Sequence, residues 1–501
     1  MSGGERHNVV LFVADQWRAK DTGYWGNAVV ETPQIDRLAA EGAGFRGCFV
    51  QNPVSTPSRA SMASGWYCHV NGHRTMHSML RGHEPNMLRY FKEAGYHVWW
   101  GGKNDMIAEE VITASCDERV TGTGGRETIN VSPWKPGDRL YHTFLWGEVP
   151  GNYGMSLSDD YVAAQAAEFV KTPIRQPFFM LVNQTYPHPP YAAPQPYFSM
   201  YERRRVPFPI PPPEEFRGKP QILRRIHERM RMDELTEDEL REIVAVYYGM
   251  VTKTDRNLGI IMEALKESGA WENTIVVATS DHGDFVGDYL LTEKTQNTFE
   301  DVLVNVPFAI RVPGCEPLPT ACEALIEMID LLPTLADACG IELGHTHFGR
   351  SLLPLLRGET ADHREYVFSE GGALEAEVHT HETDRPEENI YWSRVALQGA
   401  EPEVHGKAVM IRSKEWKYVR RLYDTDELYD LRSDPDEVNN VVDEASVAPV
   451  REQLAAAMLD WFVETGDQVP WRWDLRGPGE SHPEWSRGAA RHGFVKEWSA
   501  R

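Results

Sequence analysis

The chain has 501 residues, of which 41% are hydrophobic and 25% charged, so it is long enough for one large α/β domain and a smaller one. With 75 acidic against 51 basic residues its net charge is −24, which argues against nucleic acid or an anionic membrane as a partner. A small anionic substrate stays compatible with this charge, because a local basic pocket can form in an acidic protein.

The cysteines and the N-terminus both bear on the compartment. Six cysteines are scattered without C-x-x-C pairs, which predicts reduced, buried thiols rather than a disulfide framework. The first residues pass from a polar start directly into an apolar run, with no signal peptide and no transmembrane segment. We therefore expect a cytoplasmic protein, unless a leader has been removed.

The first predicted element is the strand Asn8–Ala14, a continuous apolar run as expected of a strand buried on both faces. Asp15 and Gln16 follow it, and ligands of open α/β sheets gather beyond the carboxyl ends of strands. Two oxygen donors at this place suit a hard cation, although an Asp that caps the following turn is the simpler alternative.

A short helix over residues 32–42 and a strand over residues 45–50 lead into the sequence NPVSTPSRAS. Ser55 lies there two residues before Pro57 and four before Arg59, and Pro57 suits a first helical turn. The pattern indicates a hydroxyl nucleophile at a helix N-terminus, where free N–H groups favour an anion, with the guanidinium of Arg59 beside it. A plain N-cap serine is the alternative.

Next come a helix over residues 84–94 and a strand over residues 96–101, and the strand runs into G-K-N-D with Lys103 and Asp105. A surface lysine after a strand is the alternative for Lys103. Because a carboxylate near an anion would repel it, we expect Asp105 to orient Lys103, to bind a metal or to contact a substrate hydroxyl.

Residues 113–152 carry little periodicity and are predicted to be loops near the mouth of a site. A helix over residues 158–170, with a capping serine, and a buried strand over residues 177–183 follow. The strand runs into P-H-P-P-Y, which contains His188. A lone histidine is more often structural than catalytic, but its place after a strand favours contact with a leaving group or an oxyanion.

Three more elements complete the predicted α/β part, namely a long helix, a strand and a helix over residues 236–268, 274–279 and 328–340. The strand delivers S-D-H-G-D, which places Asp281 and His282 at another strand end, and Lys294 follows. A simple turn at the strand end is the alternative for this motif.

A smaller C-terminal subdomain is expected beyond residue 380, so the predicted domains are residues 1–380 and 381–501. The acidic stretch 369–388 carries His379 and His381, which either line the pocket or belong to a solvated insert.

The rest of the C-terminal part is predicted to hold a strand-like segment over residues 407–422 and a closing helix over residues 450–465. The tail after Gly466 contains several tryptophans, and we expect it to pack onto the body or at a subunit contact of a homo-oligomer.

Six motifs together resemble one family, and they occur in its order. They are D-Q-x-R from Asp15, S-x-P-S-R from Ser55, G-K ending at Lys103, P-H-x-P-Y around His188, S-D-H-G around Asp281 and E-L-Y-D-L from Glu427. The chain resembles, over roughly residues 8 to 460, the sulfatases of the alkaline phosphatase superfamily, close to the branch of arylsulfatases and phosphonate monoester hydrolases. The resemblance implies an α/β sandwich, with a large mostly parallel sheet between helices, and a smaller C-terminal α+β subdomain.

The resemblance also implies roles for the residues at these positions. One divalent cation would be held by Asp15, Gln16, Asp281 and His282, and three oxygens with one imidazole favour Ca²⁺, with Mn²⁺ and Mg²⁺ as alternatives. The implied catalytic residues are Ser55, Arg59, Lys103, His188 and Lys294. Asp105, His379 and His381 are the candidates for further substrate contacts, and Asp105 stands where the family usually has a histidine.

Ser55 also departs from the family, because cysteine is commonest at this place and is converted there to formylglycine. The departure leaves three alternatives: a serine that a maturation enzyme converts to formylglycine, a Cys→Ser variant that has lost turnover, or a serine that works unmodified.

The implied activity is hydrolysis of the sulfate ester of a small molecule or saccharide. The alternatives are a phosphodiester or phosphonate monoester hydrolase and a non-catalytic protein that binds a sulfated ligand.

Overall fold

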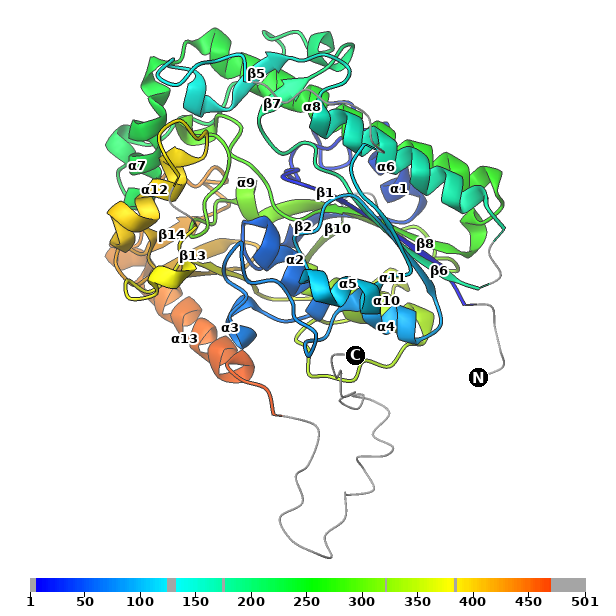
Figure 1. Ribbon diagram of the computed structural model, residues 1–501. Helices are drawn as coiled ribbons and strands as arrows, with labels where there is room; N and C mark the ends of the chain where they lie inside the picture. Colours follow the sequence, from blue (N-terminus) through cyan, green and yellow to red (C-terminus); the bar gives the residue numbers. More distant parts are fainter. Residues whose placement is uncertain (1–5, 124–131, 174–175, 320–321, 383–384, 470–501) are drawn as a thin grey trace, which may run out of the picture.

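The computed structural model describes residues 6–123, 132–173, 176–319, 322–382 and 385–469. Its main feature is an eight-stranded sheet that lies between two layers of helices (Figure 1). The strands stand in the order β10-β2-β9-β8-β1-β6-β3-β4. Their bounds are β1 Asn8–Ala14, β2 Ala43–Phe49, β3 His97–Gly101, β4 Glu118–Val120, β6 Phe178–Asn183, β8 Thr274–Ser280, β9 Asn305–Arg311 and β10 Cys322–Glu327.

The sheet is mostly parallel, as predicted. Strand β9 alone among these eight runs antiparallel to its neighbours β2 and β8, and the other pairs are parallel. The central strands β1 and β8 are apolar and almost completely buried, since helices cover both faces. Parallel strands end at one edge of a sheet, so the residues after β1, β3, β6 and β8 converge there.

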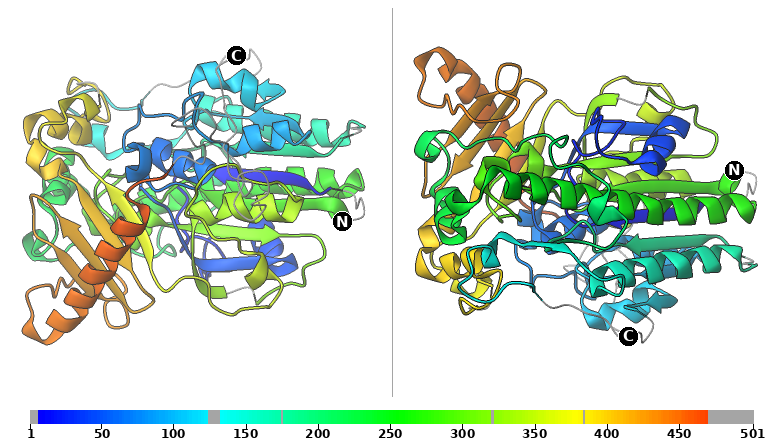
Figure 2. Two further views of the ribbon diagram at one scale, coloured as in Figure 1. Left: turned by 90° about the horizontal axis from the view of Figure 1, so that it is seen from below. Right: turned by 90° about the horizontal axis from the view of Figure 1, so that it is seen from above.

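Helices α1, α6 and α8 cover one face of the sheet, and α2, α4 and α10 cover the other (Figure 1). Seen from above, α6 and α8 lie side by side (Figure 2). The bounds are α1 Pro33–Glu41, α2 Ser55–Ser64, α4 Met87–Glu93, α6 Gly154–Lys171, α8 Glu237–Glu267 and α10 Leu331–Cys339. The long helix α8 begins where the sequence predicts, because Thr236 and Glu239 form a capping box.

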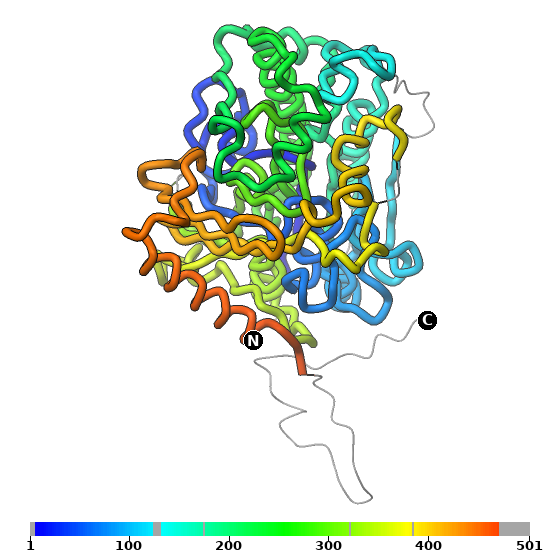
Figure 3. Tube along the Cα trace, turned by 90° about the vertical axis from the view of Figure 1, so that its left-hand side faces the viewer, coloured from blue at the N-terminus to red at the C-terminus, as the bar shows by residue number. Residues whose placement is uncertain are grey.

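A second, antiparallel sheet has the order β11-β12-β13-β14, with bounds β11 Val367–Gly371, β12 Ala408–Arg412, β13 Trp416–Arg421 and β14 Glu427–Asp430. Helix α13 (Ala448–Thr465) lies across it, in orange-red beside the orange strands (Figure 3). The ring of Trp461 on α13 stacks on Phe368 of β11, with the centroids 4.5 Å apart. The expected small C-terminal α+β part is therefore present.

The remaining elements are short. They are β5 Leu145–Glu148 and β7 Tyr191–Ala193, which pair with each other, and the helices α3 Cys68–Asn71, α5 Ile112–Ser115, α7 Gln221–Met230, α9 Asp301–Val304, α11 Leu353–Leu356 and α12 Trp392–Ala400.

Several predicted boundaries differ from the structure. The strand-like segment 407–422 consists of two strands, β12 and β13, with a turn at residues 413–415 between them. Helix α6 begins at Gly154, so Ser158 lies inside it and caps nothing. The stretch 113–152 contains the short strands β4 and β5 as well as loops. The boundary near residue 380 stays a prediction, although β11 already belongs to the second sheet.

All six cysteines are free, as the sequence predicts, but two of them, Cys315 and Cys322, are only partly buried. Within the described ranges, no helix combines the length and the hydropathy needed to cross a bilayer. Most of the tryptophan-containing tail lies outside the described residues.

Candidate active site

The strand ends bring one group of polar side chains together at the edge of the large sheet. Asp15 follows β1, Lys103 follows β3 and Asp281 follows β8. Ser55 is the first residue of α2, and its helix begins at this same edge. The main-chain connections therefore explain why residues more than 200 positions apart in the sequence meet in one site.

Asp15, Asp281 and His282 form the one group of three or more metal-ligating side chains found among the described residues. One ligand atom from each lies within 4.8 Å of the others, and all three residues are buried. The Nδ1 atom of His282 lies 2.9 Å from the carbonyl oxygen of Gly283, so the ring proton resides there and the Nε2 lone pair faces the carboxylates.

The chemistry of this group fits a hard cation. The Oδ1 atom of Asp15 is buried and accepts no hydrogen bond among the described residues, although the other oxygen pairs with Lys103 and Arg59. A buried oxygen without a partner is costly, which suits a cation bound there. This Oδ1 atom lies 3.8 Å from Nε2 of His282. Burial alone would raise the pKa of Asp15, but the positive charges around it, led by Lys103, hold that pKa well below its usual range. The carboxylate is thus ionised and ready to bind a metal.

Ser55 lies beside this group and is almost fully buried, with 1% of its surface exposed. Its Oγ atom is 3.1 Å from Nε2 of His282. Residue 54 is the N-cap of α2, so the side chain of Ser55 lies in the first turn, as the sequence predicts. The free N–H groups of that turn favour a negative charge at this place.

Arg59, one turn further along α2, is also buried and contacts protein groups. Its Nε atom donates to Oδ2 of Asp281 at 2.8 Å, and its Nη1 atom donates to Oδ1 of Asn183 at 2.9 Å. A third contact reaches Asp15 at 3.5 Å. Arg59 therefore fixes the carboxylates of the metal-ligating group, and its contact with a substrate anion stays a prediction.

Lys103 and Asp105 form an ion pair at the mouth of the site, with Nζ and Oδ2 2.6 Å apart. Lys103 also pairs with Asp15, and 22% of its side chain is exposed. Burial by itself would lower the pKa of Lys103, but the two carboxylates raise it above its usual value. Asp105 thus orients Lys103, which is one of the three roles that the sequence left open.

His188 and Lys294 lie beside each other and next to Gln16. The Nζ atom of Lys294 lies 3.1 Å from Nε2 of His188 and 2.6 Å from the side-chain oxygen of Gln16. Burial, with the charge of Lys294, lowers the pKa of His188 to about 4, so the imidazole is neutral near pH 7. Its Nδ1 atom lies 2.6 Å from the carbonyl oxygen of Pro189 and carries the proton, which leaves Nε2 as an acceptor.

The amide of Gln16 is held in one orientation. Its nitrogen donates to Asp284 at 2.6 Å, and its oxygen accepts from Lys294. The hydroxyl of Tyr191 donates to the other oxygen of Asp284 at 2.6 Å. With the nitrogen occupied, only the oxygen of Gln16 is available to a cation.

Sequence reasoning missed three residues of this site: Asn183, Asp284 and Glu293. Asn183 ends β6, and Asp284 lies in S-D-H-G-D, so their places after strands were the available signal. Glu293 precedes Lys294 and pairs with it at 2.6 Å, which no sequence pattern indicated.

The contacts among the described residues do not link the two C-terminal histidines to this group. His379 is exposed on a short helical turn, and His381 is half-buried. Within the described ranges, no hydrogen bond or ion pair joins either residue to the metal-ligating group, so their role in substrate binding stays a prediction.

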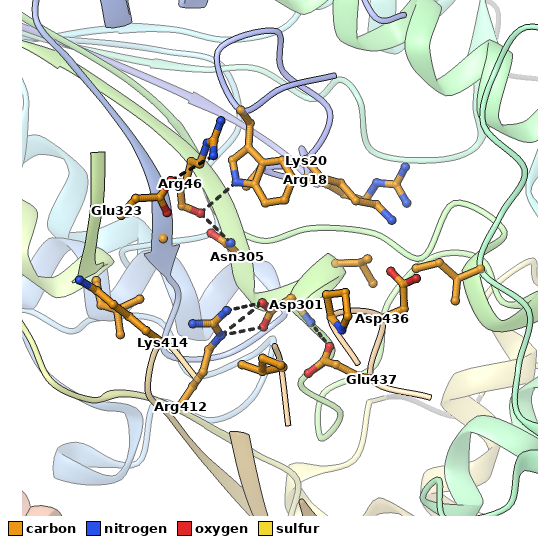
Figure 4. A pocket seen from close by; sticks show the side chains of 18 of the residues that line it. Arg18, Lys20, Arg46, Asp301, Asn305, Glu323, Arg412, Lys414, Asp436 and Glu437 are labelled. Carbon is orange, nitrogen blue, oxygen red and sulfur yellow. Dashed lines mark hydrogen bonds and ion pairs between the residues drawn. The ribbon is translucent and has the colours of Figure 1, made fainter. Parts of the chain in front are cut away.

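A separate cavity of about 470 Å³ lies between the large sheet and the antiparallel sheet (Figure 4). Five cationic side chains line it, and each already pairs with a carboxylate, namely Arg18 and Lys20 with Asp288, Arg46 with Glu323, Arg412 with Asp301 and Lys414 with Asp362. None of Asp15, Asp281 and His282 lines this cavity, so the metal-ligating group is separate from it.

The fold places a buried serine hydroxyl beside three side chains that could hold a metal ion. The sulfatase family model matches residues 7–341, and the chain belongs to the sulfatase family. It is 25% identical, over 96% of its own length and 92% of the relative, to an uncharacterized sulfatase, YidJ, of Escherichia coli strain K12.

Two solved structures share the fold. A phosphonate monoester hydrolase of Agrobacterium radiobacter superposes with a TM-score of 0.75 at 23% identity, covering 92% of this chain and 96% of that one. The protein BT4656, solved with its substrate D-glucosamine-2-N,6-O-disulfate, superposes with a TM-score of 0.71 at 20% identity, covering 92% and 98%.

Proposed function

We propose that this chain is a sulfatase that hydrolyses the sulfate ester of a small molecule or saccharide. The observation that carries the proposal is the position of Ser55, buried in the first turn of α2 and 3.1 Å from His282 of the metal-ligating group. Lys103 and Lys294 supply positive charge on two sides of this group, which suits an anion whose charge is redistributed in the transition state.

Asp15, Gln16, Asp281 and His282 would hold the divalent cation, and oxygen-rich ligation favours Ca²⁺ over Mn²⁺ and Mg²⁺. When bound, the ion would withdraw charge from the group under attack. Oδ1 of Asp15, which accepts no hydrogen bond among the described residues, and Nε2 of His282, which faces both carboxylates, support this assignment.

Residue 55 is the proposed nucleophile, as formylglycine made from Ser55 by a maturation enzyme. A hydroxyl of the hydrated aldehyde attacks sulfur, and the bond from sulfur to the ester oxygen breaks. The second hydroxyl then loses its proton, restores the aldehyde and expels sulfate. An unmodified serine would lack this last step, so its sulfated form would persist.

The leaving alcohol needs a proton, and the geometry favours Lys294 as its source. Neutral His188 accepts through Nε2 and therefore has no proton to give there. Lys294 carries the acidic protons of the pair, and His188 helps to hold its ammonium in place.

A phosphodiester or phosphonate monoester hydrolase is the second candidate, favoured by the shared fold with such an enzyme. The test is to compare kcat/KM for an aryl sulfate, an aryl phosphodiester and an aryl phosphonate monoester on protein of known residue 55 chemistry. A large preference for the sulfate supports the proposal, and a large preference for either phosphorus ester overturns it. Tight binding of a sulfated ligand without any turnover would instead indicate the non-catalytic alternative.

A further inference from the structure

Lys294, the cation that faces His188 and Gln16, is held by a second group of charges outside the metal-ligating residues. Its Nζ atom lies 2.6 Å from Oε1 of Glu293, the residue before it. The other oxygen of Glu293 lies 3.3 Å from Nε of Arg394, which belongs to α12 in the C-terminal part. The carboxylate of Glu293 is thus shared between two cations that come from different parts of the chain.

Glu293 occupies an unusual backbone conformation for its residue type. Its φ is 68°, in the left-handed region that favours glycine, and its side chain is 1% exposed. Such strain persists where the surrounding structure holds it, and it gathers at functional sites. A buried carboxylate in a strained loop indicates that the side chain is needed at this place.

The side chain of Arg394 is itself held by a second glutamate, Glu382. The Arg394 side chain is 7% exposed and pairs with both oxygens of Glu382. Glu382 also accepts from Gln296 at 2.8 Å and from Gln398 at 3.2 Å. Helix α12 packs on α7, away from the large sheet (Figure 1). The position of this helix is therefore transmitted through Arg394 to the loop that carries Lys294.

We propose that Glu293 and Arg394 are positioning residues, which together set where the ammonium of Lys294 lies in the active site. The proposal rests on the proposed function, because it assigns to Lys294 a contact with the sulfate ester. It adds that a segment about 100 residues further along the chain determines the geometry of that contact. Neither residue needs to touch the substrate.

Charge and geometry make opposite predictions for Glu293, which gives a decisive test. If its charge alone mattered, Glu293→Gln would remove a repulsion and strengthen the binding of an anion. If it positions Lys294, the same variant binds inorganic sulfate more weakly, because the lysine is free to move. Arg394→Lys keeps the charge but loses the planar fork, so positioning predicts a loss where charge alone predicts none.

The experiment measures two quantities on the metal-loaded full chain. Calorimetry gives the affinity for inorganic sulfate, and steady-state kinetics give kcat/KM for an aryl sulfate. We expect Glu293→Gln and Arg394→Lys each to weaken sulfate binding severalfold and to lower kcat/KM about tenfold or more, as misplacement of a catalytic group does. In a Lys294→Ala background, neither substitution should add to the loss.

Glu300→Gln is the matched control, because it breaks an equally buried lysine–glutamate pair, with Lys219 at 3.1 Å, outside the site. It should change neither sulfate affinity nor kcat/KM by more than about twofold. Thermal unfolding of each variant shows whether the fold is retained.

Tighter sulfate binding by Glu293→Gln would overturn the proposal, and so would effects that add fully to those of Lys294→Ala. The sulfate measurement needs no turnover. A wild-type chain that binds sulfate but does not hydrolyse sulfate esters would refute the proposed function. The sulfate affinities of the variants would still decide whether Glu293 and Arg394 position Lys294.

Discussion

The Nε2 atom of His282 lies 3.1 Å from Oγ of Ser55 and also faces the carboxylates of Asp15 and Asp281, at 3.8 and 3.7 Å. One nitrogen lone pair is therefore shared between the nucleophile position and the metal-ligating group. A cation that binds Nε2 would take that lone pair, and Ser55 would then have to be activated by the cation instead of by the imidazole.

The first prediction concerns Asp281, whose carboxylate would bind the metal and already holds Arg59. Asp281→Asn removes one negative ligand, so the variant should retain much less than one metal ion per chain and lose activity by at least about 100-fold. Elemental analysis of protein purified without chelator measures the metal. The control is Asp160→Asn, which alters the ion pair between Asp160 and Lys253. A variant that kept its metal would remove Asp281 from the ligand set.

The second prediction concerns the chemical state of Ser55. Conversion of the serine to formylglycine removes two hydrogens, so the peptide that contains residue 55 should be about two mass units lighter than its sequence requires. Intact-peptide mass spectrometry measures this difference, and Ser55→Ala should abolish turnover in the same preparation. Many turnovers by protein with an unmodified serine would instead require a direct serine mechanism.

Restoring cysteine at residue 55 separates the remaining alternatives. If the serine stands in for an original cysteine, Ser55→Cys co-expressed with a formylglycine-generating enzyme should gain activity over the parent chain. If the host converts serine, the substitution should bring no gain.

The third prediction concerns Arg59, whose guanidinium reaches Asp281 and Asn183 at the same time. Arg59→Lys keeps the charge but can satisfy only one of these partners in the observed geometry, so kcat/KM should fall about 100-fold and metal affinity should weaken. Titration with the metal and steady-state kinetics test this. Arg203→Lys, which alters a bidentate pair with Glu242 away from the site, should leave both quantities unchanged.

The fourth prediction concerns Asp159 of α6, which holds the loop that carries His188. Its two oxygens accept from the backbone N–H groups of Thr185 and Tyr186, each at 2.8 Å. Burial raises its pKa from an ordinary value of 3.8 to about 7. A carboxyl group whose pKa is higher in the folded than in the unfolded protein adds to the free energy of unfolding at pH values below its unfolded pKa. This contribution is lost as the pH rises through the folded pKa.

The free energy of unfolding of the wild type, taken relative to Asp159→Asn, should therefore fall by about 2 kcal/mol between pH 5 and pH 7. Its slope is about 1.4 kcal/mol per pH unit below the folded pKa, and the difference should stay level above pH 7. Urea unfolding of both proteins at pH 5, 6, 7 and 8 measures the difference. A difference that is constant across this range would show that Asp159 is ionised in the folded protein throughout.

The sequence predicted which residues lie close together where those residues directly follow strands of the parallel sheet. The buried runs before Asp15, Lys103 and Asp281 predicted strands, and a parallel sheet must bring their ends together. Helix α2 begins at Ser55 because Val54 before it is extended and Pro57 fits its first turn.

The sequence could not show contacts that depend on how distant elements pack. Arg394 lies about 100 residues beyond Glu293, and nothing in either segment specifies their ion pair. The partners of Arg59 were likewise hidden, because the direction of a side chain depends on the packing of its helix. His379 and His381 attracted attention by composition alone, and composition carries no information about position.

All ten residues of α2 are buried in the folded protein, and Ser55 exposes only 1% of its surface. An enzyme that oxidised this serine would need its side chain and the flanking main chain in its own active site. The proposed conversion of Ser55 to formylglycine would therefore have to precede closure of the α/β core, while the segment is still extended. The proportion of active molecules would then depend on the rate of modification relative to the rate of folding during synthesis. Slower folding would yield more active protein.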